Sequence, residues 1–330
     1  MAKVFNGQWL KFVTQLYTPE CGSQTLTISN RVGLAVDKDS NHAFIMDAPG
    51  ETFIINYKGV IYLPDPDRKN NTGPMDLSIL NGNFVLMGNN DNDVDGCLRM
   101  GTGDGLILTM QRDSTFSIEG SSNVLIAHDS VGYNHYFESN LYDNSTLSVN
   151  LNNNRDIHGI CIIGGTYNLT DEASFFIYYP SSVKGHSFQR AYFKRTKINL
   201  ESRSRLEINA DIILAQNLNG SSGLIINIHD NASVKLQSQS GEKDPLQILT
   251  SDEYYQGLLN FSETSQGKVS VDVPDGRQNS TGLALIMLKK IIAINNTPVL
   301  SKDFINYFDI SYDTATRDGK SVGVITFLKK

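Results

Sequence analysis

Apolar and polar residues alternate in short segments that recur along most of the chain. Each segment has an apolar residue at its second position and another two residues later, which is the period of a strand with one face turned to a core. The segments recur every 27 to 35 residues, about 30 on average, a spacing typical of a solenoid. Nine copies fit the pattern: TLTIS at Thr25, TFIIN at Thr52, NFVLM at Asn83, TFSIE at Thr115, TLSVN at Thr146, SFFIY at Ser174, RLEIN at Arg205, SVKLQ at Ser233 and KVSVD at Lys268.

The aligned copies form columns, and each column has a physical meaning. Leu, Phe or Val fills the first apolar position, and Ile, Leu or Val fills the second, so we expect both columns to be buried. From the fourth copy onward the residue between them is polar except at Phe176. Two residues before the first column, seven copies have a small residue where the chain must turn tightly: Gly82, Ser114, Ser145, Ala173, Ser204, Ala232 and Gly267.

Further strand-like runs within each repeat complete the predicted coil. They include VLIA at Val124, GICII at Gly159, DIILA at Asp211 and GLIINI at Gly223. Two or three short strands per repeat can bury their apolar side chains only when another coil stacks on them. The sequence therefore predicts an all-β fold, a right-handed parallel β-helix with about nine coils of about 30 residues.

Capping elements are expected at both ends, because open ends of a solenoid expose unpaired strands. We predict an N-terminal cap over 1–24, a parallel β-helix over 25–280 and an α+β C-terminal cap over 281–330. In the first cap, helical spacing is shown by Trp9, Phe12, Val13 and Leu16. In the second, SKDFINYF reads as a helix opened by Ser301, followed by a hairpin turning at Asp318 and Gly319.

Composition and charge narrow the class of protein. Asn and Gly occur 31 and 27 times against 13 Ala, which favours strands and turns over helices. The formal net charge of −7 argues against a nucleic-acid partner, and the longest apolar run is far too short to span a membrane. Three cysteines at wide spacing, Cys21, Cys97 and Cys161, are expected to be buried thiols.

The phrases DSTFSIEG, DNSTLSVN and DNASVKLQS, with GLLNFSETSQGKVSVDV near the end, resemble the passenger segments of bacterial autotransporter adhesins of the pertactin class. The resemblance covers roughly 25–310 and implies a parallel β-helix, a binding role associated with virulence, and an extracellular or cell-surface location. A phage tailspike or tail fibre is a second resemblance. The first residues lack a secretory signal pattern, so the export route stays open.

A basic and aromatic segment is the main candidate binding site. Lys184 to Arg205 carries a net charge of +6 in an acidic chain, and we place Tyr178 to Arg195 in a long loop after a coil's first strand. Arg and Lys beside exposed rings suit an anionic polysaccharide, whereas the alternative is a solvated loop whose rings fill the core. The candidate residues are Lys184, Arg190, Tyr192, Lys194, Arg195 and Lys197.

Aromatic residues recur at similar places in three successive repeats. Tyr136 and Tyr167 both lie 20 residues beyond their first apolar position, and Tyr192 lies 17 beyond its own. An exposed column of rings would extend the ligand-binding face, and an inward aromatic stack would give the same pattern.

Metal and catalytic signals are weak. Asp91, Asp93 and Asp95 match the first half of a calcium loop, but Thr102 stands where a bidentate Glu is needed, so Ca²⁺ is the only cofactor considered. Asp113 and Glu172 are the acids of the turn column, and the Asn and Asp there are explained by turn formation. We assign no catalytic residue.

These patterns favour a non-enzymatic, adhesin-like β-helix that binds cell-surface glycans. A polysaccharide-degrading enzyme of the tailspike or lyase kind is one alternative. A self-associating structural or fibre protein, and hence a homo-oligomer, is the other.

Overall fold

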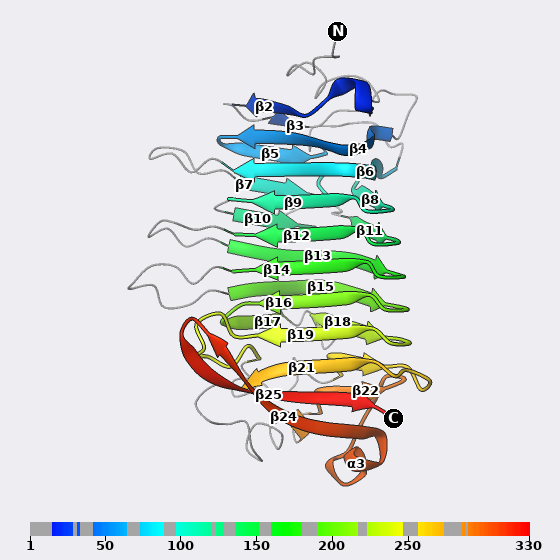
Figure 1. The fold of residues 1–330 in the computed structure, drawn as a ribbon, viewed down its shortest axis with the longest axis vertical. Helices are drawn as coiled ribbons and strands as arrows, with labels where there is room; N and C mark the ends of the chain where they lie inside the picture. Colours follow the sequence, from blue (N-terminus) through cyan, green and yellow to red (C-terminus); the bar gives the residue numbers. More distant parts are fainter. Residues whose placement is uncertain are drawn as a thin grey trace. The chain divides into compact units, whose positions relative to one another are not determined.

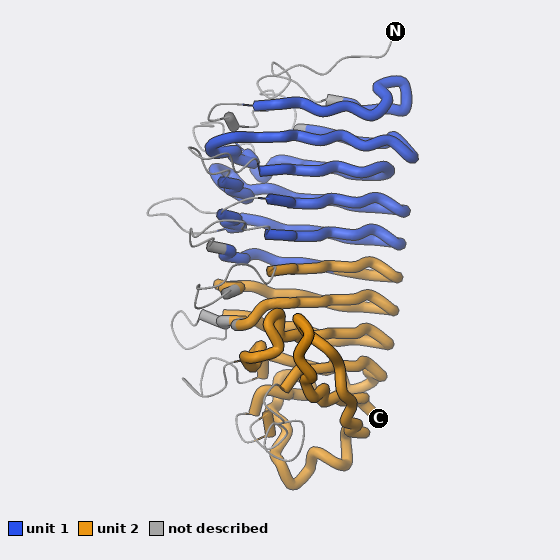
Figure 2. The backbone as a smooth tube through the Cα atoms, turned by 60° about the vertical axis from the view of Figure 1, so that its left-hand side comes forward, with its two compact units in different colours: residues 1–168 blue, residues 169–330 orange. Residues whose placement is uncertain are grey.

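The computed structural model describes residues 15–28, 32–33, 42–64, 73–88, 97–120, 123–127, 136–151, 160–179, 190–216, 223–246, 257–273, 286–287 and 290–330. They group into two compact units, 1–168 and 169–330 (Figure 2). The structure is nearly all β, with parallel strands stacked into a β-solenoid. The predicted β-helix is therefore confirmed.

The first unit contains thirteen strands among the described residues (Figure 1): β1 (Gln15–Tyr17), β2 (Gln24–Ile28), β3 (Val32–Gly33), β4 (His42–Tyr57), β5 (Val60–Leu63), β6 (Met75–Gly88), β7 (Cys97–Met100), β8 (Leu106–Met110), β9 (Thr115–Glu119), β10 (Asn123–Ile126), β11 (Phe137–Leu141), β12 (Thr146–Asn150) and β13 (Ile160–Leu169). A 3-10 turn, η1 (Pro19–Cys21), lies between β1 and β2.

Three parallel sheets surround the core of this unit. One sheet runs β2, β4, β6, β9, β12. A second contains β1, β8, β11 and the first halves of β4 and β6. The third runs β3, β5, β7, β10 and the start of β13. Each turn of the solenoid therefore has three sides, as the extra strand-like runs predicted.

The second unit has the same architecture and adds antiparallel strands. Its strands in the described part are β14 (Ser174–Tyr178), β15 (Arg190–Leu200), β16 (Arg205–Asn209), β17 (Ile212–Gln216), β18 (Leu224–Ile228), β19 (Ser233–Gln237), β20 (Leu259–Phe261), β21 (Lys268–Val273), β22 (Ile292–Ile294), β23 (Thr297–Pro298), β24 (Phe308–Arg317) and β25 (Lys320–Lys329). Two short helices, η2 (Ser301–Asp303) and α3 (Phe304–Tyr307), lie before β24.

All nine copies of the repeated segment form strands. Both apolar columns are buried from the second copy to the last, and side chains between them point outward. Counted as turns, however, the solenoid has about six, not the nine coils predicted.

The first copy is shifted relative to its predicted alignment. The alignment placed Leu26 level with Phe53, whereas Leu26 pairs with Ile55 and Ile28 pairs with Tyr57. A shift of two residues keeps the same side chains facing inward, so apolar alternation cannot detect it.

The predicted tight turns are confirmed and stack on one another. In the second unit, Asp171, Ser202 and Asp230 each adopt a positive φ, between 47° and 56°. The backbone N–H of Arg203 donates to the carbonyl of Asp171 at 2.8 Å, and that of Asn231 donates to Ser202 at 2.9 Å. The positive φ explains why Asp recurs at these corners, because Asp tolerates this conformation better than most residues.

The C-terminal hairpin is confirmed. β24 and β25 pair antiparallel from Phe308 with Lys329 to Arg317 with Lys320. Asp318 and Gly319 connect them with φ of 43° and 75°, the positive values that a two-residue hairpin turn needs. Ser301 is not a cap, because it is the first residue of η2 and Leu300 occupies the cap position.

The helix predicted near the N-terminus is contradicted at Leu16, the last of the four residues whose spacing suggested it. Leu16 lies in strand β1 and is exposed, and Trp9, Phe12 and Val13 lie outside the described residues. Cys21 and Cys161 are buried free thiols, while Cys97 is half-buried. Burial raises the pKa of the Cys161 thiol to about 12, so it is un-ionised at neutral pH.

Candidate functional site

From Arg190 on, the basic segment forms a strand where a loop was predicted, and 180–189 lie outside the described residues. Arg190 to Leu200 is the single strand β15, whose first part pairs with β17 and whose second part pairs with β18. Arg195 lies at the corner between the two sides, with a φ of 53°. The loop prediction is wrong for Arg190 to Arg195, because Arg and Lys at outward positions give the same sequence pattern on a strand as in a solvated loop.

The side chains of β15 present a mixed surface. Arg195 and Lys197 are exposed, and Lys194 and Tyr192 are half-buried. Inward positions between them, such as Phe193, are buried in the core. Lys184 lies outside the described residues, as does the side chain of Arg190. Three cations therefore reach solvent within four residues, in a chain whose net charge is negative.

The predicted aromatic column does not exist as an exposed surface. Tyr136 is exposed, but Tyr167 is fully buried and packs on Phe137 with ring centroids 5.4 Å apart. The Asn168 amide donates to Asn140 at 2.8 Å, which places Tyr167 three positions out of register with Tyr136. Tyr167 is therefore a core residue and no part of a ligand surface.

The other predicted site residues are either paired or outside the described part. Asp91, Asp93 and Asp95 are outside it, and no group of metal ligands occurs among the residues that the structure describes. Asp113 accepts from the Asn144 amide at 3.0 Å. Glu172 pairs with Arg203 at 2.5 Å, so both turn-column acids have structural partners.

The second unit contains a ladder of asparagines that was not predicted from the sequence. Asn227 donates to the Oδ1 of Asn199 at 2.8 Å, and Asn260 donates to the Oδ1 of Asn227 at 2.8 Å. Asn296 continues it, because its backbone N–H donates to Asn260 at 2.8 Å. Asn199, Asn227 and Asn260 occupy paired positions on β15, β18 and β20, a recurrence about every 30 residues that could have revealed them, and Asn296 lies in the turn after β22.

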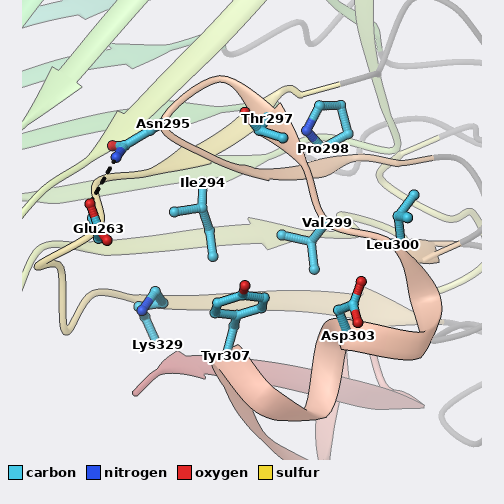
Figure 3. A pocket seen from close by; sticks show the side chains of 10 residues that line it. All are labelled: Glu263, Ile294, Asn295, Thr297, Pro298, Val299, Leu300, Asp303, Tyr307 and Lys329. Carbon is cyan, nitrogen blue, oxygen red and sulfur yellow. Dashed lines mark hydrogen bonds between the residues drawn. The ribbon is translucent and has the colours of Figure 1, made fainter.

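A cleft near the C-terminal hairpin was also missed. It has a volume of about 430 Å³ and lies between the β22–β23 hairpin on one side and η2, α3 and β25 on the other (Figure 3). Ten residues line it: Glu263, Ile294, Asn295, Thr297, Pro298, Val299, Leu300, Asp303, Tyr307 and Lys329. Its volume lies within the range of small-molecule sites.

Local sequence explains both walls of the cleft. Asn295 and Asn296 turn the β22–β23 hairpin with φ of 47° and 63°, conformations that Asn tolerates well. On the opposite wall, Phe304 and Phe308 are buried and their rings lie 5.0 Å apart, which fixes α3 and leaves Tyr307 facing the opening. The cleft depends on segments more than 60 residues apart.

Polar groups lie around an apolar floor (Figure 3). Ile294 and Val299 face the Tyr307 ring, with Asp303 at one end and Glu263 and Lys329 at the other. The Asn295 amide donates to Glu263 at 3.5 Å. The arrangement offers an apolar surface with donors and acceptors at its ends.

Lys329 is the unusual group in the cleft. It is only 7% exposed, and its Nζ lies 5.8 Å from the centre of the Tyr307 ring. Its ammonium donates to the main-chain oxygen of Lys330 at 2.9 Å. Among the described residues, no side-chain carboxylate lies within 4 Å of it. An ammonium can donate three hydrogen bonds, so this one retains donor capacity toward the cleft.

No protein-family model matches the chain, and comparisons with curated proteins and with solved structures also find no match. Within the described residues, no helix is both long and apolar enough to cross a membrane. The functional argument therefore depends on the chain's own geometry and chemistry.

Proposed function

We propose that the protein is a non-enzymatic, adhesin-like β-helix that binds anionic polysaccharide at cell surfaces. The observation that supports this is the cationic outer surface of β15, formed by Lys194, Arg195 and Lys197. Cations close together along one strand suit an extended polyanion, because carboxylate and sulfate groups repeat along such a chain.

The surroundings of these cations favour a binding role over a purely structural one. Among the described residues, neither Lys194 nor Lys197 forms an ion pair, whereas Lys235, also at an outward position, pairs with Glu207 at 3.4 Å. Tyr192 precedes the cations on the same strand and is half-buried, so part of its ring is accessible for stacking on a sugar.

The experiment measures retention on a heparin-like sulfated matrix and on a uronate-containing polysaccharide. The test variant is K194S/R195S/K197S, and the matched control is K243S/K268S/K302S, which removes the same charge from exposed lysines elsewhere. We expect the test variant to lose at least tenfold in affinity and the control less than twofold. Equal losses in the two variants would show a non-specific charge effect and refute the site.

Salt dependence provides a second readout. Contacts between exposed charges are screened as ionic strength rises, so wild-type affinity should fall steeply between 50 and 300 mM salt. The test variant should show a shallower fall. Polysaccharide that is shortened during incubation with the wild-type protein would instead favour the enzymatic alternative.

A further inference from the structure

From the cleft beside the C-terminal hairpin we infer a second ligand site that takes a short, uncharged saccharide. The site is separate from the β15 surface and does not depend on it. Its walls are Ile294, Val299 and Tyr307, and its polar groups are Glu263, Asn295, Asp303 and Lys329.

The mixed charges of the cleft favour a neutral, polar ligand over a simple ion. Glu263 and Asp303 would repel an anion, and the buried ammonium of Lys329 would repel a cation at the end it shares with Glu263. The ligand must satisfy donors and acceptors within the same small space.

A hydroxyl group meets this requirement. It accepts a hydrogen bond from an ammonium and donates one to a carboxylate at the same time, whereas Lys329 only donates and Glu263 only accepts. Asn295, which both donates and accepts, lies beside Glu263. Two or three neighbouring hydroxyls on one ring would therefore satisfy this end of the cleft.

The apolar part of the cleft suits the same ligand. A sugar ring has a face of C–H groups, and that face packs well on an aromatic ring. Tyr307 is 43% exposed and its ring faces Ile294 and Val299 across the cleft (Figure 3). Asp303 at the far end can accept from a further hydroxyl, and the 430 Å³ volume suits one end of a saccharide chain.

The probe is an array of uncharged oligosaccharides of hexoses and N-acetylhexosamines, with sulfated and uronate oligosaccharides on the same surface. The full chain is compared with Y307A and E263Q. Y312A is the matched control, because Tyr312 is 49% exposed and lies on β24 outside the cleft. Glu263 is exposed, so E263Q tests the site even if Y307A fails to fold.

We expect the full chain to bind at least one uncharged saccharide, Y307A and E263Q to lose at least tenfold, and Y312A to change less than twofold. K329M should also lose binding while keeping the shape of the cleft. No binding to any uncharged saccharide, or equal losses in Y307A and Y312A, would overturn the inference.

Loss of binding at the β15 surface should leave binding at the cleft intact, and the reverse. K194S/R195S/K197S should lose the sulfated and uronate ligands and keep the uncharged ones, and Y307A should do the reverse. Loss of both ligand classes in Y307A alone would indicate one shared site and contradict this inference while leaving the proposed polysaccharide binding in place.

Discussion

Asp272 of β21 and Arg317 of β24 form a bidentate ion pair, with Nε to Oδ2 at 2.8 Å and Nη2 to Oδ1 at 3.2 Å. Asp272 is 2% exposed, and its Oδ2 also accepts from the backbone N–H of Ser238 at 3.0 Å. The pair joins the C-terminal hairpin to β21, which pairs parallel with β19 and antiparallel with β25. Burial raises the pKa of Asp272 above its ordinary value, even though Arg317 and Ser238 act in the opposite direction.

Replacing Arg317 by Met should destabilise the second unit strongly. The substitution keeps the aliphatic stem and leaves a buried carboxylate without its cation, which costs about 3 to 5 kcal/mol. The free energy of unfolding, measured by urea denaturation at pH 7, tests this. K320M, which breaks the exposed Lys320–Glu242 pair beside the same hairpin turn, is the control and should change little.

The effect of R317M should depend on pH. In the wild type the raised pKa of Asp272 means that stability is lost as pH rises through the folded-state pKa. Without Arg317 this pKa rises further, so the difference in stability between wild type and R317M should be largest near pH 7 and shrink on acidification. A difference that stays constant with pH would mean that Arg317 acts through packing alone.

Sequence patterns predicted the strands and turns of the coil but not which side chains form a site on its surface. The apolar columns, the small turn residues and the Asp318–Gly319 hairpin each depend on neighbours in sequence, and all were predicted correctly. The shift of Leu26 by two residues was invisible, because it preserves which side chains face inward.

The candidate sites required the tertiary structure. Tyr136 and Tyr167 have equivalent spacings, yet one is exposed and the other buried, because spacing along the chain does not fix the register of strands. The cleft brings Glu263 close to Lys329, and no local pattern marks two residues that far apart. Lys329 reads as an ordinary terminal lysine until the fold shows that it is buried.

The corner aspartates are expected to stabilise the stacked turns. In the first unit, the Oδ2 of Asp143 accepts from the backbone N–H of Arg112 at 2.7 Å, and Asp143 itself has a φ of 56°. D143A loses this bond and places Ala in a conformation that it disfavours, so we expect a loss of about 1 to 2 kcal/mol. D143G also loses the bond but tolerates the φ, and D143N retains an acceptor. Urea denaturation should therefore rank stability as D143N, then D143G, then D143A, and a D143G less stable than D143A would contradict this account.

Substitution of Asn260, at the centre of the asparagine ladder, should lower the stability of the protein. The Asn260 amide donates to Asn227 at 2.8 Å and to Asn296 at 3.1 Å, and its Oδ1 accepts the backbone N–H of Asn296. N260A leaves the buried Asn227 side chain without this donor, which costs about 1 to 3 kcal/mol, whereas Asn296 is exposed and can bond to water. N306A, on the exposed surface of α3, should change stability by less than about 0.5 kcal/mol.

Replacing Asn260 by Asp tests the hydrogen bonding of the ladder more directly. N260D would direct a carboxylate at the acceptor oxygens of Asn227 and Asn296, so its pKa should be raised and its protonated form favoured. Stability of N260D relative to wild type should therefore fall as pH rises from 4 to 7. Denaturation curves that are parallel at both pH values would show that the ladder does not constrain the side chain at this position.

Buried serines of the turns are expected to differ in their effect on stability, according to whether their hydroxyl has a hydrogen-bond partner. Within the described residues, the Oγ of Ser204 is buried and makes no hydrogen bond, whereas its counterparts in the adjacent turns are Ala173 and Ala232. A buried hydroxyl without a partner costs free energy, and removing it relieves that cost. S204A should therefore be neutral or more stable by up to about 1 kcal/mol.

Ser265 is the matched control for Ser204. It is equally buried, but its Oγ donates to the Asp230 carbonyl at 3.3 Å and accepts from the Gly267 N–H at 2.9 Å. S265A leaves that N–H unpaired, so we expect a loss of about 1 to 2 kcal/mol in the free energy of unfolding. Both substitutions remove the same atom from equally buried positions. Opposite changes in the free energy of unfolding would therefore reflect the difference in hydrogen bonding. If S204A destabilises as much as S265A, the Ser204 hydroxyl has a partner in solution and this interpretation of the turns is wrong.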